Sequence, residues 1–218
     1  MLNDFLEPVL LSIEISLTSG IIVIVLGILM GWIMVNKTFR GKIIIETIIL
    51  LPLVLSPTVI GFLLIVIFGK NSWLGEIIEL VFHRSLLFTW WAAVIASAVV
   101  AFPLMYQAAK AGFHEVDKDI EGAALVDGAS RFQVFLNISI PLASKILLAG
   151  SIMSFARALG EFGATLMFAG NIPGKTQTLP TAIYVAIDSG NMKMAWIWVI
   201  TTILISFFML FIIQCKKN

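Results

Sequence analysis

Long apolar segments separated by short polar stretches make up most of this chain, and segments of this length predict helices that cross a membrane. We expect about five membrane spans, at residues 9–35, 43–68, 87–109, 142–168 and 194–213. Two shorter apolar pieces, residues 76–86 and 180–188, predict short helices that do not cross, although deep insertion of either would add a sixth membrane helix. The pattern therefore predicts an all-α, polytopic transmembrane helix bundle, formed by one domain over residues 1–218.

The composition is that of a membrane protein rather than of a soluble domain. The chain has 218 residues, of which 60% are hydrophobic and 12% are charged, and its mean hydropathy is +1.04. Soluble domains are far less apolar, so membrane lipid is the expected surrounding. A net charge of +1 argues against a nucleic-acid partner. The single cysteine, Cys215, cannot form an internal disulfide and has no neighbours of metal-ligand type, so no metal site is expected.

Basic residues directly after the first and the last predicted span indicate how the chain is oriented. They are Lys37, Arg40, Lys42, Lys216 and Lys217. Because loops rich in Lys and Arg stay in the cytoplasm, we expect the N-terminus outside and the C-terminus inside. The first seven residues carry acids but no Lys or Arg, which is unlike the start of a signal peptide. The first apolar run should therefore remain in the mature protein.

Two prolines, Pro52 and Pro57, lie inside the second predicted span and should kink or break its helix. Within lipid, such a break is tolerated only where it faces protein or a water-filled cavity. Ser56 and Thr58 are therefore candidates to line a translocation pathway. The alternative is a simple proline kink whose freed carbonyl groups are partly satisfied by these two hydroxyls.

A pair of opposite charges, Arg157 and Glu161, lies deep in the fourth predicted span. On a continuous helix, residues four apart meet on one face. A charge near the bilayer centre costs ~2.5–3.5 kcal/mol on insertion scales, so each needs a partner or water. Gly160 and Gly163 flank Glu161 and can open the helix. The pair either fixes the helix against a second subunit, or lines a pathway in which Arg157 attracts an anion and Glu161 restrains Arg157.

The longest polar interruption, residues 121–142, predicts two short amphipathic helices joined by a glycine bend at Asp127–Gly128. Small or apolar residues recur at helical spacing on both sides of this bend. They are Ile120, Ala123 and Ala124 before it, and Phe132, Phe135 and Leu136 after it. A glycine permits a bend that a β-carbon would strain. Pro141 suits the first turn of the helix that returns to the membrane.

Such a segment, at about residues 115–141, is suited to docking another protein. Ala123 and Ala124 are small, so the backbone of a partner can come close to them. Glu121, Asp127 and Arg131 can pair with charges across an interface. From spacing alone, the alternative is a solvated loop that lies on the membrane surface.

Neither a catalytic site nor a nucleotide-binding site can be assembled from the sequence. Gly174-Lys175-Thr176 looks like the end of a phosphate-binding P-loop, but that motif needs a glycine where Ala169 stands. His83 and His114 are predicted on opposite sides of the membrane, without catalytic partners. We therefore expect neither an enzyme nor a bound cofactor, and ATP, if used, should bind a separate chain.

The polar interruption also resembles the cytoplasmic signature loop of ABC importer permeases: Glu-Ala-Ala, three residues, Gly, nine residues, Ile-x-Leu-Pro. The register is kept by Ala123, Ala124, Gly128, Ile138 and Pro141. The chain departs from the pattern at Gly122, where the first Glu is usual, and at Ile140, which replaces Leu. Glu121 stands one residue earlier than the usual Glu, as in the molybdate-type permeases.

The resemblance to permease subunits of bacterial molybdate transporters extends over roughly residues 40–185. It is carried by residues 40–42, 51–61, 155–165, 170–176 and 179–184. The core Arg-Ala-Leu-Gly-Glu-Phe-Gly, residues 157–163, is shared with sulfate permeases and therefore indicates a tetrahedral oxyanion. The short chain and the segment after Gly170 favour molybdate over sulfate or tungstate.

This resemblance implies a type I ABC importer permease in a bacterial cytoplasmic membrane. It also implies a second copy of the chain in a two-fold dimer, two cytoplasmic ATPase subunits and an extracytoplasmic molybdate-binding protein. The expected ATPase-docking residues are Glu121, Ala123, Ala124, Asp127, Gly128, Arg131 and Pro141. A secondary transporter or channel that needs no ATP is the alternative from another class, but it would leave the docking segment without a role.

Overall fold

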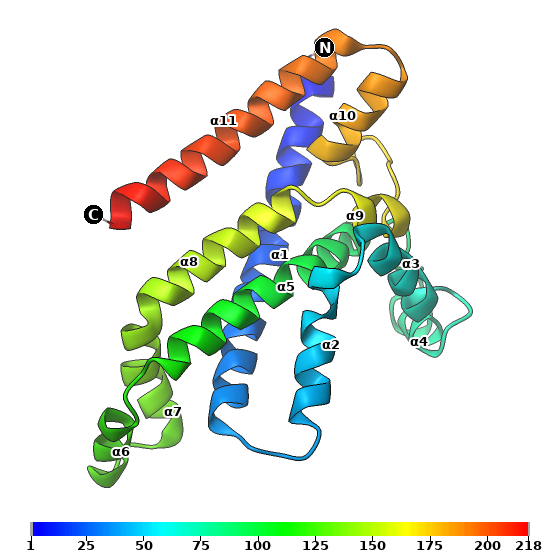
Figure 1. Cartoon of the computed structure of the whole chain (residues 1–218). Coiled ribbons are helices and arrows are strands. Elements are labelled where there is room, and N and C mark those ends of the chain that lie inside the picture. Colours follow the sequence, from blue (N-terminus) through cyan, green and yellow to red (C-terminus); the bar gives the residue numbers. More distant parts are fainter. Residues whose placement is uncertain (1, 218) are drawn as a thin grey trace.

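The computed structural model describes residues 2–217, without the side chains of residues 2–4, 82 and 212–217. The side chains of Cys215, Lys216 and Lys217, which bear on disulfide chemistry and orientation, lie outside the described residues. The described part folds into helices joined by loops (Figure 1). In chain order these are α1 (Leu2–Asn36), α2 (Lys42–Val54), α3 (Pro57–Phe68), α4 (Trp73–Phe82), α5 (Trp90–His114), α6 (Lys118–Val126), α7 (Arg131–Val134), the π-helical turn η1 (Phe135–Ser139), α8 (Ile140–Leu159), α9 (Gly163–Phe168), α10 (Leu179–Asp188) and α11 (Met192–Lys217).

Four helical segments of the described residues are long and apolar enough to cross a membrane. They are Phe5–Asn36, Trp90–His114, Arg131–Leu159 and Met192–Phe211. A fifth crossing is present if α3 and α4, which are bent by 64° relative to each other, form one broken span. The predicted all-α polytopic bundle is confirmed, and α1, α5 and α11 are the first, third and fifth predicted spans. The short helices predicted at 76–86 and 180–188 correspond to α4 and α10.

The second predicted span, residues 43–68, is wrong as a single helix, because it consists of α2 and α3 with a break at Leu55–Ser56. Pro57 is the first residue of α3, where its missing N–H removes no hydrogen bond. The Ser56 hydroxyl caps α3 by accepting a hydrogen bond from the Val59 N–H at 3.4 Å. The predicted proline break is therefore confirmed at Pro57, whereas Pro52 lies inside α2.

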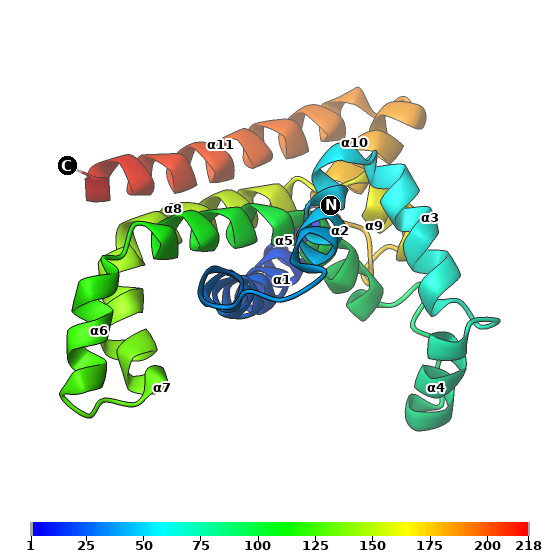
Figure 2. The ribbon, with the colours of Figure 1, turned by 60° about the horizontal axis from the view of Figure 1, so that its bottom comes forward.

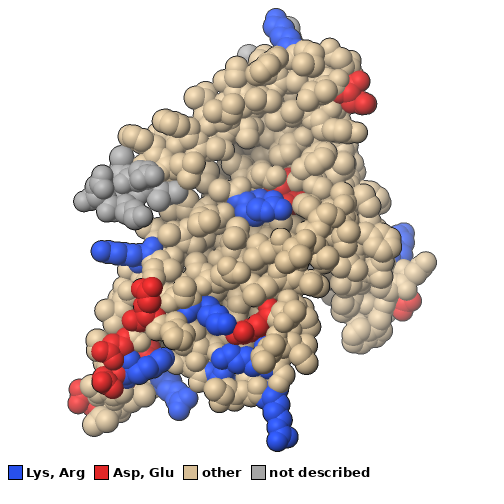
Figure 3. All heavy atoms as spheres, in the orientation of Figure 1, with Lys and Arg blue, Asp and Glu red and all other residues tan. Residues whose placement is uncertain are grey.

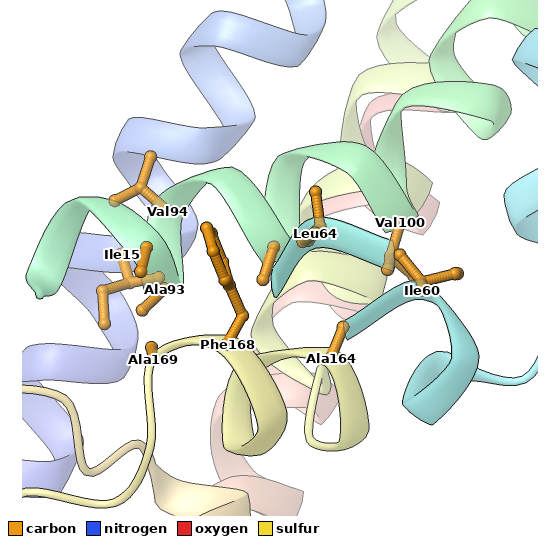
Figure 4. Close-up of a cluster of buried hydrophobic side chains, with 11 residues drawn as sticks. Ile15, Ile60, Leu64, Ala93, Val94, Val100, Ala164, Phe168 and Ala169 are labelled. Carbon is orange, nitrogen blue, oxygen red and sulfur yellow. The ribbon is translucent and has the colours of Figure 1, made fainter. Parts of the chain in front are cut away.

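The fourth predicted span, residues 142–168, is also wrong as a single helix. α8 ends at Leu159, Gly160 caps it, and α9 begins at Gly163. Tertiary packing stabilises α9 as a helix separate from α8, because Phe168 of α9 is fully buried against α3 and α5. Figure 4 shows Phe168 extending from α9 toward α5, with Leu64 of α3 nearer to it than Ile60.

The centre of the bundle is formed by α1, α5 and α8, which pack against one another (Figures 1 and 2). Glycines let these helices approach closely. A β-carbon at Gly31 of α1 would lie 2.6 Å from the Ala109 Cβ and 3.0 Å from the Lys110 backbone nitrogen of α5. Gly27 meets Met105 in the same way, so α1 and α5 are held at a distance that glycine sets.

Several parts project from this bundle, and helix α4 is one of them (Figure 2). The α6–α7 pair extends at one end, and α11 runs along the outside with most of its surface exposed (Figures 1 and 2). Large apolar side chains such as Phe207 and Phe208 are exposed on α11. These exposed apolar surfaces are suited to contact with lipid or with another protein chain. The central bundle positions the charged and bent segments.

The glycine contact between α1 and α5 generates a stability prediction. Gly31→Ala should lower the free energy of unfolding by ~1–3 kcal/mol, because the added methyl group forces two backbones apart. Gly122→Ala is the control: a β-carbon there meets nothing within 4 Å, and alanine favours helix. Thermal unfolding of the detergent-purified protein measures both. A Gly31→Ala melting temperature equal to that of the native protein would contradict the close contact.

Candidate functional site

The predicted pair of short helices with a glycine bend is confirmed as α6 and α7. Asp127 ends α6, and Gly128 follows with φ of 94°, a left-handed conformation that favours glycine. Ser130 starts α7 with a capping box in which Gln133 Oε1 accepts from the Ser130 N–H at 2.7 Å. Both sides of the bend are thus fixed by local hydrogen bonds, and the pair stands at one end of the molecule (Figure 2).

Pro141 lies in the first turn of α8, as predicted, but α8 is not a separate helix. The chain is helical from Arg131 through η1 into α8, so α7 and the membrane span are continuous. Pro141 cannot donate a backbone hydrogen bond, and in a regular α-helix its ring would clash with the preceding turn. The π-helical turn, where the Ile140 N–H reaches Phe135 O, widens the helix directly before the proline and accommodates it.

Most of the predicted docking residues lie on the outside of this pair of helices. Ala123, Asp127, Gly128 and Arg131 are exposed, and Ala124 is half-buried. Large apolar side chains are exposed beside them, on both helices and on η1. They are Ile120, Leu125, Val126, Phe132 and Leu136. The end of the molecule therefore presents an apolar surface with charges at its edge, which is chemically suited to a protein partner.

Glu121 differs from the other predicted docking residues because its side chain points inward and is only 12% exposed. The Ser139 hydroxyl donates a hydrogen bond to Glu121 Oε1 at 2.6 Å. Lys118 Nζ lies 3.1 Å from Glu121 Oε2. Both carboxylate oxygens are therefore engaged within the chain.

Arg157 and Glu161 do form a pair, with Arg157 Nη1 2.7 Å from Glu161 Oε2. The assumption of a continuous helix was wrong, since Glu161 lies beyond the end of α8. Its other oxygen, Oε1, accepts a hydrogen bond from the Ala164 N–H of α9 at 2.8 Å. The Glu161 side chain is 1% exposed and that of Arg157 is 32% exposed. Figure 3 shows basic and acidic atoms side by side, surrounded by residues without charge, near the end of α8.

The two helix breaks meet each other through Gly163. A β-carbon there would lie 2.9 Å from Pro57 Cβ and 3.3 Å from the Thr58 backbone nitrogen, so the starts of α9 and α3 are in close contact. Ser56 and Thr58 are exposed, and their hydroxyl oxygens are 3.0 Å apart. Gly160 is exposed as well. The structure thus brings the predicted pathway residues to one region of the molecule, although a role in translocation stays a prediction.

Sequence reasoning missed a second ionic contact inside the bundle. Lys110 Nζ of α5 lies 2.8 Å from Glu46 Oε1 of α2, and the buried Tyr106 hydroxyl donates to the same oxygen at 3.1 Å. Because α2 has no buried residue, this contact is important for holding it against α5. The signal was present in the sequence, since Glu46 is a lone acid within a long apolar run.

The segment that looks like a P-loop uses its backbone internally. The N–H groups of Lys175, Thr176 and Gln177 all approach Ile172 O, at 3.0, 2.9 and 3.1 Å. In a P-loop these groups would instead face a phosphate. The turn is therefore a structural one.

Comparison with known proteins relates the whole chain to membrane transport. Residues 23–215 match the family described as binding-protein-dependent transport system inner membrane component. The chain is 64% identical over 216 residues to YvgM of Bacillus subtilis (strain 168), a protein that carries the name of a molybdenum transport system permease, covering 99% of this chain and 95% of that one. It is 41% identical over 183 residues to the molybdenum transport system permease protein ModB of Escherichia coli (strain K12), covering 84% and 80%.

A solved structure shows the same fold. The MetNI methionine ABC transporter in inward-facing conformations contains a chain that superposes with a TM-score of 0.74, covering 97% of this chain and 94% of that one. Sequence identity is 14%, so this likeness concerns the fold alone. The architecture is that of a type I ABC importer permease.

The double role of Glu161 generates a stability prediction. Glu161→Ala should destabilise the protein by ~3–5 kcal/mol, because it removes the partner of Arg157 and the acceptor for the Ala164 N–H. Glu161→Gln keeps an acceptor oxygen and should cost less. Exchanging the charges, with Arg157→Glu and Glu161→Arg, should fail to restore stability, since arginine cannot accept from Ala164. Melting temperatures of the purified variants test this order, and full stability of the exchanged pair would refute it.

Proposed function

This chain belongs to the family of binding-protein-dependent transport system inner membrane components, and we propose that it is the membrane-spanning permease subunit of an ATP-driven importer of molybdate. The observation that carries the proposal is the exposed α6–α7 pair, which keeps the Ala123-Ala124 and Gly128 register of the ABC importer signature. Its bend is held by local hydrogen bonds, so it is a preformed surface for a partner rather than a loop without structure.

One copy of this chain would need several partners to transport an anion. Four or five candidate spans are few for enclosing a pathway, so we infer a two-fold dimer of this chain. Two cytoplasmic ATPase subunits would dock on the α6–α7 pairs, which places these pairs and the C-terminus inside and the N-terminus outside. An extracytoplasmic binding protein would deliver the anion from the other side. The chain itself would transport rather than catalyse, with ATP bound by the ATPase subunits.

The coupling path is the continuous helix from Arg131 to Leu159. At 1.5 Å per residue this helix is roughly 40 Å long, enough to connect the docking surface with the far side of a membrane. Its far end carries Arg157 and leads into the break before α9. When ATP draws two ATPase subunits together, a movement of the docked helices is passed along a stiff rod to the helix break. This is rigid-body coupling through an interface.

Molybdate is the substrate supported by the two relatives, both of which carry a name for molybdenum transport. Sulfate and tungstate have the same charge and tetrahedral shape. Arg157, whose side chain is partly exposed, offers positive potential to any such dianion. Selection among them would therefore rest mainly on the binding protein.

Reconstitution in liposomes tests the proposal. We expect the complex of this chain with its ATPase and binding protein to accumulate molybdate only with ATP, and more than sulfate or tungstate at equal concentration. Gly128→Val should assemble but lose nearly all uptake, because a β-branched residue resists a φ of 94°. Uptake without ATP would instead indicate a secondary transporter or channel, and preference for sulfate or tungstate would reassign the substrate.

The pathway role of Arg157 can be separated from its structural role. Arg157→Gln should lower molybdate uptake by about tenfold or more, because one unit of positive charge is lost where the dianion passes. Basal ATP hydrolysis by the assembled complex should remain. Lys193→Gln, at the exposed start of α11, is a matched control for loss of one positive charge. An assembled, stable Arg157→Gln complex with full uptake would exclude the pathway role.

A further inference from the structure

The orientation of the docking helix α6 is not set by apolar packing. None of its nine residues, Lys118–Val126, is buried. On the side toward the bundle lies a hollow of about 240 Å³, lined by the acids Glu115 and Asp117 as well as by Gly112, Val116, Ile120, Leu142 and Ile146. A helix that buries no side chain and borders a hollow needs another source of rigidity if it is to transmit movement.

Polar contacts provide that rigidity. Lys118 Nζ at the start of α6 donates to Asn36 Oδ1 at the end of α1, at 3.0 Å. Lys118 also pairs with Glu121 at 3.1 Å, and Glu121 in turn accepts from the Ser139 hydroxyl at 2.6 Å. Ser139 is fully buried in η1, the π-helical turn that leads into α8. We call these four residues, Asn36, Lys118, Glu121 and Ser139, the polar strut.

The polar strut holds one half of α6, and the bend after Asp127 holds the other. At the bend, the Ala129 N–H donates to Ala124 O at 3.0 Å and the Gly128 N–H to Leu125 O at 3.2 Å. Beyond it, α7 continues without interruption into η1 and α8. Glu121 and Ser139 thus close a loop between two helices that are already joined covalently. Closing it prevents α6 from pivoting about the glycine bend.

We propose that Glu121 is a positioning residue, which fixes α6 rigidly to α1 and α8 so that movement of a docked ATPase reaches the membrane helices. This inference rests on the proposed function and assigns Glu121 a different role from that of a direct ATPase contact. The two roles make opposite demands on the side chain. A direct contact needs a free, outward carboxylate, whereas this one is turned inward with both oxygens engaged.

Ser139 makes the two roles separable, because a fully buried hydroxyl cannot touch a docked ATPase. In the reconstituted complex, the quantity to measure is molybdate imported per ATP hydrolysed. Ser139→Ala and Glu121→Gln should each lower this ratio about fivefold or more, as expected for loss of a strong, charge-assisted hydrogen bond. The losses of the two single variants should be less than additive in the double variant, since both changes weaken the same contact between Ser139 and Glu121.

Two variants control for the chemical changes alone. Asp119→Asn removes one negative charge from an exposed position of the same helix, where the side chain takes no part in the polar strut. Ser19→Ala removes a buried hydroxyl that donates only to Ser16 O of its own helix. Both should keep the native ratio of transport to hydrolysis.

Amide hydrogen exchange of residues 118–126 in the purified full-length chain gives a readout that does not depend on transport. Exchange should become faster in Ser139→Ala and in Glu121→Gln, and stay unchanged in both controls. Unchanged amide exchange in Ser139→Ala would refute the proposal that the polar strut fixes α6. So would a native transport ratio in Ser139→Ala together with weaker ATPase binding in Glu121→Gln. Absence of ATP-dependent uptake by the native complex would refute the proposed function instead, and the exchange result would still decide on the strut.

Discussion

A helix that breaks inside the apolar part of a membrane leaves backbone N–H and C=O groups that lipid cannot satisfy, and the arrangement of this chain depends on how each break is satisfied. At the start of α3, the Ser56 hydroxyl accepts one freed N–H. At the start of α9, the buried Glu161 carboxylate accepts another, and Arg157 balances its charge. Before Pro141, a π-helical turn makes room for the proline ring, so the helix continues without a break. Polar residues are therefore concentrated where the helices are irregular.

Two of these breaks lie against each other, which explains why glycine stands at Gly163. The start of α9 meets Pro57 and Thr58 so closely that a β-carbon would collide with them. The charged pair, the capped ends and the exposed hydroxyls of Ser56 and Thr58 are thus collected near the far end of α8. The other end of the same continuous helix leads from the α6–α7 pair, the proposed docking surface. A single stiff element thereby connects the two regions in which the chemistry of transport would occur.

The membrane character, the helical class and the bent pair of helices α6 and α7 were all predictable from local sequence, because they depend on properties that act over a few neighbouring residues. The bend at Gly128, the capping residues and the break before Pro57 belong to the same category. Prediction failed where a distant contact decides the outcome. Beyond the end of α8 at Leu159, Phe168 of α9 is buried against α3 and α5, and the link between Glu46 and Lys110 joins residues 64 positions apart.

The sequence by itself determined that this chain lies in a membrane as a bundle of helices and contains a bent polar segment. Apolar runs long enough to span a bilayer, and a glycine between two amphipathic stretches, are sufficient for that. Only the tertiary structure decided which way the polar side chains face. Its neighbours in sequence predict that Glu121 lies at an interface. In the structure its side chain points inward, because it accepts a hydrogen bond from Ser139, 18 residues later. The physical reason is that a carboxylate near a buried hydroxyl and an ammonium group is stabilised by partners that only the folded chain brings within reach.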